Sequence, residues 1–441
     1  MTLMREALQK GLFSQTNNEG DCFVIEACRA GEQRYKPGKS CILSYHLQIL
    51  NTKTKSVQEQ IIYARLCKPG EGFSEFERAS RKELFALKGV RPLVYLPDVE
   101  MVVWSFPNDR KLTHLPKMLD LPFLYDLLPR RLTSLGLHQS KYLRQIKADI
   151  IHYLPERSCM IRYELELENR KSGEVVPVAV FGKIYPDESG GEVYCIMGQL
   201  SGQMEGLKIA KPLGYDPELR ALWQSEIPGR PFKQEEIALP DCGKVMAQMA
   251  VTVAAFHRTR LSSQRQFRLE DMKALLKETD DTTKKTCPQL TDRIGFLVHS
   301  LLIRSETIGC ASLPITPIHG DLKIGNMLIH EDKVGLIDMD CVCLGDPLYD
   351  IGSFIANFYH NGILIGSDES KMRALVEAFC RVYSEQVEWE VSQERLHWHI
   401  AAAFIYEIAR RSIRQWNVKR MEHLNQYLDL SERYCFHRQE K

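Results

Sequence analysis

The chain has 441 residues, a length that fits two or three domains of ordinary size. Hydrophobic residues make up 44% and charged residues 26%, values that exclude a disordered or fibrous chain. The 58 Lys and Arg residues nearly balance the 57 Asp and Glu residues, so we expect no nucleic acid polymer as partner.

The sequence also shows no sign of a membrane-spanning segment, a signal peptide or a set of disulfides. No apolar run reaches the roughly 20 residues of a membrane-spanning helix, and the nearest, residues 294–303, contains His299. Residues 1–10 lack the apolar centre and the cleavage site of a signal peptide. The 13 cysteines show neither metal-ligand nor disulfide spacing. We therefore expect a cytoplasmic protein with free thiols and no membrane partner; the sequence leaves its oligomeric state open.

Two stretches near the N-terminus resemble each other. When residues 35–53 are aligned with residues 153–171, eight of 19 positions are identical. The pattern favours a duplicated β-rich domain over two similar hairpins that arose by coincidence. The first copy is expected over residues 1–115. Residues 116–145 are predicted as a helical linker, within a leucine-rich stretch, 112–150, that predicts two helices.

The second copy, residues 146–232, predicts its own strands. Residues 159–168 alternate between apolar and polar side chains, and residues 175–185 are rich in β-branched ones, so both are predicted strands around a turn. A helical stretch and a short strand near Ala221 follow. Residues 233–441 show helical periodicity and are predicted to form an α-rich domain. Because the strands and helices are segregated, the fold class is α+β.

The chemistry-bearing side chains lie between residues 315 and 355. Asp321 and Asn326 are five positions apart on one loop, and Asp338 follows a neighbouring short strand. The carboxylate of Asp338 and the amide oxygen of Asn326 form the hard oxygen site that Mg²⁺ prefers. Asp321 is then left to orient a substrate hydroxyl and accept its proton, which is the division of labour that phosphoryl transfer requires.

A family resemblance rests on three motifs in this segment. His-Gly-Asp-x-x-x-x-Asn at 319–326, Ile-Asp-Met-Asp at 337–340 and Gly-Asp-Pro-Leu-Tyr-Asp-Ile-Gly at 345–352 resemble the aminoglycoside phosphotransferase and choline kinase-like family. The resemblance implies a protein-kinase-like fold with two lobes, a β-rich ATP-binding small lobe over residues 146–232 and a helical large lobe over residues 233–441. Residues 1–115 would then be an extra, non-catalytic copy of the small lobe.

The same resemblance implies the roles of the acidic and amide side chains. Asp321 corresponds to the catalytic base, whereas Asn326 and Asp338 correspond to the magnesium ligands. Lys323 would approach the transferring phosphate. Asp346, which precedes Pro347, is predicted to cap a helix and to take no part in the chemistry.

Two further residues are implied as structural supports of the loop formed by residues 319–326, called the catalytic loop below. His319 would brace this loop near Asp338, and Asp350 would anchor it. His257 lies on a predicted amphipathic helix, and a buried or capping role is favoured over a catalytic one.

The nucleotide side is expected in the second β-rich copy. Lys183 lies in the middle of a predicted strand and is the candidate to pair the ATP α- and β-phosphates, the alternative being a surface lysine. The aligned residue of the first copy is Arg65, which favours the second copy as the working lobe. Glu192 is the best candidate to pair with Lys183, with Glu188 and Glu205 as alternatives.

Other nucleotide contacts are assigned to two loops. The chain contains no Gly-x-Gly-x-x-Gly, so the turn 155–158 is the candidate to cover the phosphates, with Arg157 reaching one of them. Residues 224–229 are predicted as the hinge between the lobes, with the backbone of Glu226 and Ile227 bound to adenine.

The sequence therefore predicts a kinase that uses ATP and Mg²⁺ to phosphorylate a hydroxyl of a small metabolite, such as a sugar, an amino alcohol or an aminoglycoside-like compound. A non-catalytic kinase-like protein that binds or regulates through the duplicated domain is the alternative. The first copy could also regulate the kinase by docking over its cleft. A basic run over residues 410–420 is interpreted as a solvated helix face, the alternative being a site for a phosphorylated substrate.

Overall fold

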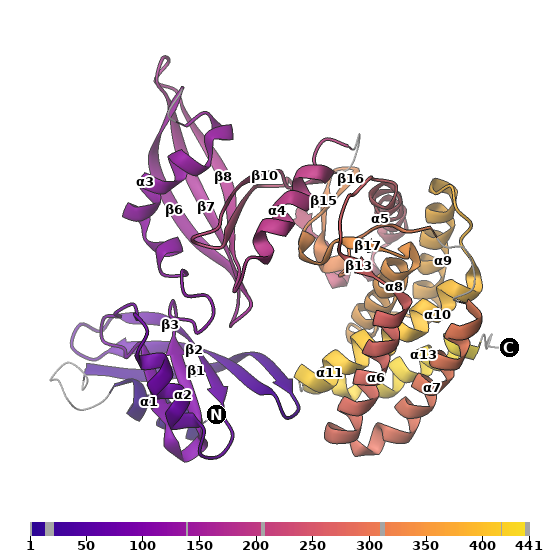
Figure 1. Ribbon diagram of the computed structural model, residues 1–441, viewed down its shortest axis with the longest axis horizontal. Coiled ribbons are helices and arrows are strands. Elements are labelled where there is room, and N and C mark those ends of the chain that lie inside the picture. The colour runs from indigo at the N-terminus through magenta and orange to yellow at the C-terminus, as the bar shows by residue number, and fades with distance from the viewer. Residues whose placement is uncertain are drawn as a thin grey trace. The chain divides into compact units, whose positions relative to one another are not determined.

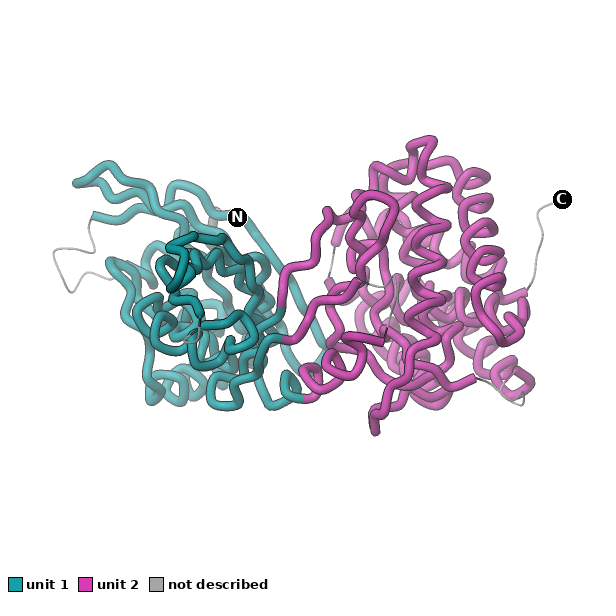
Figure 2. The backbone as a smooth tube through the Cα atoms, turned by 90° about the horizontal axis from the view of Figure 1, so that it is seen from above, with its two compact units in different colours: residues 1–191, 213–224 teal, residues 192–212, 225–441 magenta. Residues whose placement is uncertain are grey.

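The computed structural model describes residues 2–13, 22–137, 140–203, 208–308, 314–415 and 417–436. Glu205, one of the alternatives named above, lies outside these ranges. The chain divides into two compact units (Figure 2). The first contains residues 1–191 and 213–224, and the second contains residues 192–212 and 225–441. No helix within the described ranges has the length and apolar character needed to cross a bilayer.

The first unit begins with a five-stranded sheet of order β1-β2-β3-β5-β4. Its strands are β1 (Phe23–Lys36), β2 (Ser40–Asn51), β3 (Val57–Leu66), β4 (Leu93–Leu96) and β5 (Met101–Ser105). Side chains alternate between two buried clusters, as a strand period of two requires. Ile62 and Val103 join the cluster that contains Leu8 of α1 (Thr2–Leu12), whereas Tyr63 and Trp104 join the one that contains Ala79 of α2 (Gly72–Ser80). The two helices therefore pack against opposite faces of this sheet, beside which Figure 1 labels them.

A second five-stranded sheet of the first unit has the order β10-β11-β8-β7-β6. Its strands are β6 (Lys141–Leu154), β7 (Ser158–Asn169), β8 (Val175–Ile184), β10 (Pro212–Asp216) and β11 (Ala221–Ser225). The helix α3 (Leu121–Arg131) contributes Leu124 and Leu128 to a core that also contains Ile161 and Val180 of the sheet. This core is the hydrophobic support of the predicted nucleotide lobe.

The two sheets correspond strand by strand. β6, β7 and β8 begin and end 118 positions after β1, β2 and β3, and the last two strands follow in the same spatial order. This correspondence is what the predicted duplication requires. A common origin of the two sheets stays a prediction.

The predicted pair of helices over residues 112–150 is wrong in its second half. Among the residues of this stretch that the structure describes, only α3 forms as an α-helix, and β6 already begins at Lys141. A bulge between Leu143 and Gln145 places the inward-facing Leu143 and Ile146 three positions apart. That spacing is typical of a helix, although β6 pairs with β7 along its whole length.

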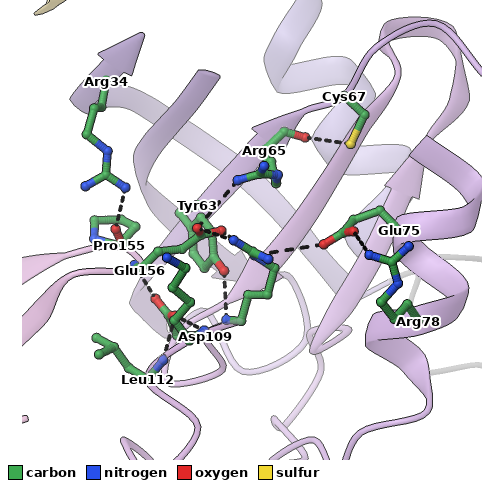
Figure 3. Close-up of polar contacts among 12 residues, drawn as sticks. Arg34, Tyr63, Arg65, Cys67, Glu75, Arg78, Asp109, Leu112, Pro155 and Glu156 are labelled. Atoms are coloured by element: carbon green, nitrogen blue, oxygen red, sulfur yellow. Dashed lines mark hydrogen bonds and ion pairs between the residues drawn. The ribbon is translucent and has the colours of Figure 1, made fainter. Parts of the chain in front are cut away.

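A buried ion pair joins the two sheets of the first unit (Figure 3). The guanidinium of Arg110, after β5, donates to both carboxylate oxygens of Glu156, at 2.8 and 2.7 Å, and Arg65 lies 3.5 Å from the same carboxylate. The Glu156 side chain is only 3% exposed. Asp109 accepts the Glu156 backbone N–H at 2.9 Å. Burial favours the neutral form of Glu156, but Arg110 and Arg65 outweigh it and hold the pKa of this carboxyl below its usual value.

The second unit is mainly helical, which together with the β-rich first unit confirms the predicted α+β class. Its helices are α4 (Ser189–Leu200, which begins in the first unit), α5 (Cys242–His257), α6 (Leu269–Thr286), α7 (Thr291–Ile308), α8 (Pro347–Leu364), α9 (Glu369–Gln386), α10 (Gln393–Ala403), α11 (Arg410–Gln415), α12 (Val418–Glu422) and α13 (Leu424–Phe436). Its strands are β9 (Lys208–Ile209), β12 (Arg230–Pro231), β13 (Gln266–Phe267), β14 (Thr316–Ile318), β15 (Met327–His330), β16 (Lys333–Leu336) and β17 (Cys343–Gly345). They form the small sheets β12-β15-β16-β9 and β13-β17-β14.

Replacing Arg110 tests the ion pair between the sheets. We expect Arg110→Met to lower the free energy of unfolding by about 3 kcal/mol, because it leaves the buried Glu156 carboxylate without its bidentate partner. Urea unfolding monitored by circular dichroism measures the change. Because the folded pKa of Glu156 is lowered, the loss is expected in full at neutral pH and to shrink as pH falls through that pKa.

The matched control is Arg78→Met. Arg78 pairs with Glu75 at 3.1 Å, but its side chain is 72% exposed, so its removal should cost well under about 1 kcal/mol. Equal losses in the two variants would contradict the importance assigned to the Arg110–Glu156 contact.

Candidate active site

The predicted metal ligands lie at one end of the β15–β16 hairpin. Met327 is opposite Leu336 in the antiparallel register, and the N–H of Ile337 donates to the carbonyl oxygen of Asn326 at 3.1 Å. Asp338 follows directly, in a left-handed conformation with φ 65°. The register therefore brings Asn326 and Asp338 together, although they are far apart on the hairpin sequence.

Asp350, in the first turn of α8, holds the start of the catalytic loop. Its carboxylate is fully buried and accepts the backbone N–H groups of His319, at 2.5 Å, and Gly320, at 2.9 Å. It also lies 3.1 Å from Nε2 of His257, whose Nδ1 is 2.8 Å from the Tyr383 hydroxyl. Because a carboxylate accepts hydrogen bonds, His257 donates to Asp350 through Nε2. His257 is thus the buried, hydrogen-bonded histidine that the sequence predicted.

The imidazole of His319 connects the loop to the metal side of the hairpin. Its Nε2 donates to the carbonyl oxygen of Ile337 at 2.9 Å, and the residue is fully buried. Gly320 follows with φ +75°, and a Cβ placed there would lie 2.3 Å from the carbonyl oxygen of Cys341. Glycine is therefore required at this position, both for the conformation and for the close approach.

The candidate base, Asp321, lies among several polar partners. Its Oδ2 forms an ion pair with Lys323, and its side chain is 25% exposed. The amide nitrogen of Asn326 donates to the carbonyl oxygen of Asp321 at 2.9 Å. Since the amide nitrogen is used in this way, the amide oxygen is the atom of Asn326 that remains for a metal.

The donor set fits a magnesium ion that is shared with a ligand. Among the described residues, no group of three or more His, Cys, Asp or Glu side chains could hold a metal ion. The Asp338 carboxylate and the Asn326 amide oxygen are hard ligands, and Mg²⁺ typically takes one or two protein ligands and completes its shell with phosphates and waters. These two residues would hold it.

Sequence reasoning did not assign Arg411 and Glu407 to the site. A π-helical segment, Phe404–Ala409, separates α10 from α11, and π-helical turns occur frequently at functional sites. Arg411 lies 3.9 Å from the Oδ1 of Asp321 and 3.6 Å from the carboxylate of Glu407. Burial raises the pKa of Glu407. The four-residue spacing of Glu407 and Arg411 predicts only that the two side chains pair on a helix, so the sequence carried no signal for the contact with Asp321.

A cavity of about 340 Å³ lies beside the catalytic loop, entirely within the second unit. Lys323 and Gly325 of the loop line it, together with Asn357 and His360 of α8 and Arg411 of α11. Because Lys323 and Arg411 also contact Asp321, a molecule in this cavity lies next to the candidate base.

The candidate phosphate-binding lysine belongs to the first unit. Lys183, on β8, lies opposite Met160 of β7 and is only 8% exposed. Its Nζ is 5.6 Å from the ring centroid of Tyr185. A side chain buried to this extent argues against the alternative interpretation, in which Lys183 is a solvated lysine on the surface. The corresponding residue of the first sheet, Arg65, contacts Glu156 instead.

The carboxylates proposed to pair with Lys183 have other contacts. Glu192, in the first turn of α4 and the second unit, lies 3.7 Å from Arg265. Glu188 lies 3.5 Å from Arg220 and is largely exposed. Lys183 and Glu192 belong to different units, and their pairing stays a prediction.

The turn 155–158 has few donors left for a phosphate. The backbone N–H of Glu156 is bound to Asp109, and that of Arg157 is bound to the carbonyl oxygen of Leu154 at 2.9 Å. These two backbone N–H groups are therefore engaged within the protein, whereas the side chain of Arg157, the predicted phosphate contact, is exposed. Phosphate binding by this turn stays a prediction.

The predicted hinge residues connect β11 to β12. The chain passes from the first to the second unit between residues 224 and 225, directly before Glu226 and Ile227. Ile227 is 8% exposed and lies close to Gly335 of β16. Adenine binding by this backbone stays a prediction.

Asp346 caps α8, as predicted. Its carboxylate accepts the N–H of Leu348 at 3.0 Å and also pairs with Arg395 and His399 of α10. Burial favours the neutral form, but His399 and Arg395 hold the pKa of Asp346 well below its usual range.

Residues 184–393 match the Phosphotransferase enzyme family (APH), which confirms the resemblance inferred from the motifs and the predicted enzyme class. The matched region includes the whole catalytic loop and the hairpin that follows. It begins directly after Lys183 and leaves out the first sheet. No curated protein matches the chain.

The chain is also similar to solved kinase structures. A choline kinase from Cryptosporidium parvum is 11% identical, with a TM-score of 0.49, and the similarity covers 72% of this chain and 96% of that one. A choline/ethanolamine kinase family protein from Mesorhizobium loti is 13% identical, with a TM-score of 0.43 and coverages of 61% and 84%. An ethanolamine kinase from Plasmodium vivax is 11% identical, with a TM-score of 0.43 and coverages of 75% and 94%. Similarities of this size do not define a substrate.

Two glycine variants test the close packing of the catalytic loop. Gly320→Ala is expected to lower the free energy of unfolding by at least about 3 kcal/mol, since it adds both a left-handed alanine and a clash with the Cys341 carbonyl. Gly366→Ala should cost only about 1 kcal/mol, because Gly366 has a similar φ of +69° but open space around its Cβ. Chemical denaturation of the two variants gives the comparison, and a Gly320→Ala protein as stable as Gly366→Ala would contradict this account.

Proposed function

We propose that the protein is a kinase that uses ATP and Mg²⁺ to phosphorylate a hydroxyl group of a small metabolite. The observation that carries the proposal is the position of Asp321. It follows a loop start fixed by Asp350, contacts two cationic side chains, and adjoins a cavity of the size of a small metabolite.

Asp321 would serve as the base for the acceptor. A hydroxyl of a molecule in the cavity donates a hydrogen bond to the Asp321 carboxylate, which takes its proton as the oxygen attacks the γ-phosphorus of ATP. The bond between that phosphorus and the oxygen bridging to ADP breaks, and ADP leaves. The ammonium of Lys323, now paired with Asp321, is placed to shift toward the transferring phosphoryl group.

The remaining assignments concern the nucleotide. A bound Mg²⁺ would neutralise charge on the phosphates, and Asn326 and Asp338 would hold it. Lys183 would pair the α- and β-phosphates with support from Glu192, Arg157 would reach a phosphate, and the backbone at 226–227 would bind adenine.

Removal of the base is the direct test of this function. Asp321→Asn should lower Mg²⁺-dependent ADP release by about 10²- to 10⁴-fold in the presence of an acceptor, since the amide cannot take the proton. Screening of metabolite alcohols with a coupled ADP assay supplies the acceptor and the rates.

Asp332→Asn is the matched control. Asp332 lies in the turn of the same hairpin, pairs with Lys244, and is 77% exposed, so its loss should leave the rate unchanged. Full activity in Asp321→Asn would reject the mechanism. A wild-type protein that binds nucleotide but transfers no phosphate would favour the non-catalytic alternative.

The role of Asp338 as a metal ligand can be tested separately, through the dependence of turnover on the Mg²⁺ concentration. Asp338→Asn should raise the Mg²⁺ concentration for half-maximal turnover by about tenfold or more, because a charged ligand becomes a neutral one. Titration of Mg²⁺ after removal of metal with EDTA measures the shift. The same Mg²⁺ dependence in wild type and Asp338→Asn would remove Asp338 from the metal site.

A further inference from the structure

The charged side chains that line the cavity beside the catalytic loop are all cationic. Three cationic side chains line it, namely Lys323, Arg411 and Arg420, and no Asp or Glu within the described ranges does so. The carboxylates of Asp321 and Glu407 contact Arg411, but neither residue is part of the lining. A site that selects a cationic acceptor would present carboxylates or a cage of aromatic rings, and Phe232 is the only aromatic ring other than His360 in the described lining.

The neutral groups of the cavity are suited to hydroxyls. Asn357, Asn361 and Gln234 present amides, and the Nδ1 of His360 is bound to the hydroxyl of Tyr427 at 2.9 Å. Burial, together with the charges of Arg420 and Arg411, lowers the pKa of His360 to about 3, so its imidazole is neutral at physiological pH. The positive charge of the cavity therefore resides in the arginines and the lysine.

The arginines differ in their distance from the reaction. Arg411 contacts Asp321, so it lies next to the reacting hydroxyl. Arg420, on α12, donates through one of its nitrogens to the amide oxygen of Gln415 at 2.7 Å, and this contact holds the planar fork of the guanidinium at the cavity wall. Such a fork is the geometry with which arginine binds phosphate and carboxylate groups.

We propose that the acceptor is a small hydroxylated compound with a negatively charged group, a phosphate or a carboxylate, and that Arg420 binds this group. The inference rests on the proposed kinase function, which makes this cavity the acceptor site. It favours the alternative interpretation of the basic run 410–420 over a simple solvated face.

A panel of four matched hexoses tests the charge preference. Glucose 6-phosphate, glucuronate, glucose and glucosamine share one ring and differ in charge. Binding to the full chain is measured by calorimetry with Mg²⁺ and AMP-PNP present, so that the nucleotide site is filled. At least one anion should bind about tenfold more tightly than glucose, and glucosamine should bind most weakly. The stronger of the two anions distinguishes a phosphate from a carboxylate preference.

Variants of the arginines show which side chain causes the tighter binding of the anionic hexoses. Arg420→Gln should reduce the advantage of the anion over glucose to about twofold or less, and Arg420→Lys should keep part of it, because the charge remains but the fork is lost. Arg410→Gln is the control, since Arg410 pairs with Glu278 at 2.7 Å and does not line the cavity; it should keep the full advantage.

The outcomes separate this inference from the kinase proposal. Binding of glucose or glucosamine as tight as that of the anions, no binding of either anion at millimolar concentration, or an anion preference untouched by Arg420→Gln would each overturn it. Titration of AMP-PNP alone reports on the nucleotide site. Failure of that titration would count against the kinase proposal, whereas the charge preference of the cavity can be measured without nucleotide.

Discussion

The buried carboxylate of Asp350 is the interaction on which the candidate site depends. An ionised carboxylate removed from water is costly unless several donors satisfy it. Here the donors are the backbone N–H groups of His319 and Gly320 and the imidazole of His257. Two of these donors belong to the loop itself. The hydrogen bonds that satisfy the carboxylate therefore also fix the backbone of the loop directly before Asp321.

The same turn of α8 also positions the other wall of the cavity. Asp346, four residues before Asp350, pairs with Arg395 and His399 and so ties α8 to α10. The π-helical segment after α10 then leads to Arg411, which contacts Asp321. One helix start therefore fixes both the base and the cationic wall, which lie far apart in the sequence.

The sequence predicted those features that depend on short-range patterns. The pattern around Asp321, Asn326 and Asp338 predicted a loop followed by two short strands, and the structure has these elements, because strand register follows from a short turn. Patterns failed where a local irregularity or a distant partner decides the outcome. The bulge in β6 gave a helical spacing. The Arg110–Glu156 pair joins residues 46 positions apart, and it uses the buried side of the turn expected to cover phosphates. Arg411 depends on a π-helical segment that no spacing rule announces.

The central claim is that Asp350 holds the loop so that Asp321 can act on an acceptor. The most direct measurement is single-turnover transfer of the labelled γ-phosphate by Asp350→Asn, compared with AMP-PNP binding by the same protein. An amide at this position places a donor against donors, so the account predicts that transfer falls by about 10²-fold or more while a cooperatively folded protein still binds the nucleotide. Transfer at the wild-type rate would contradict it.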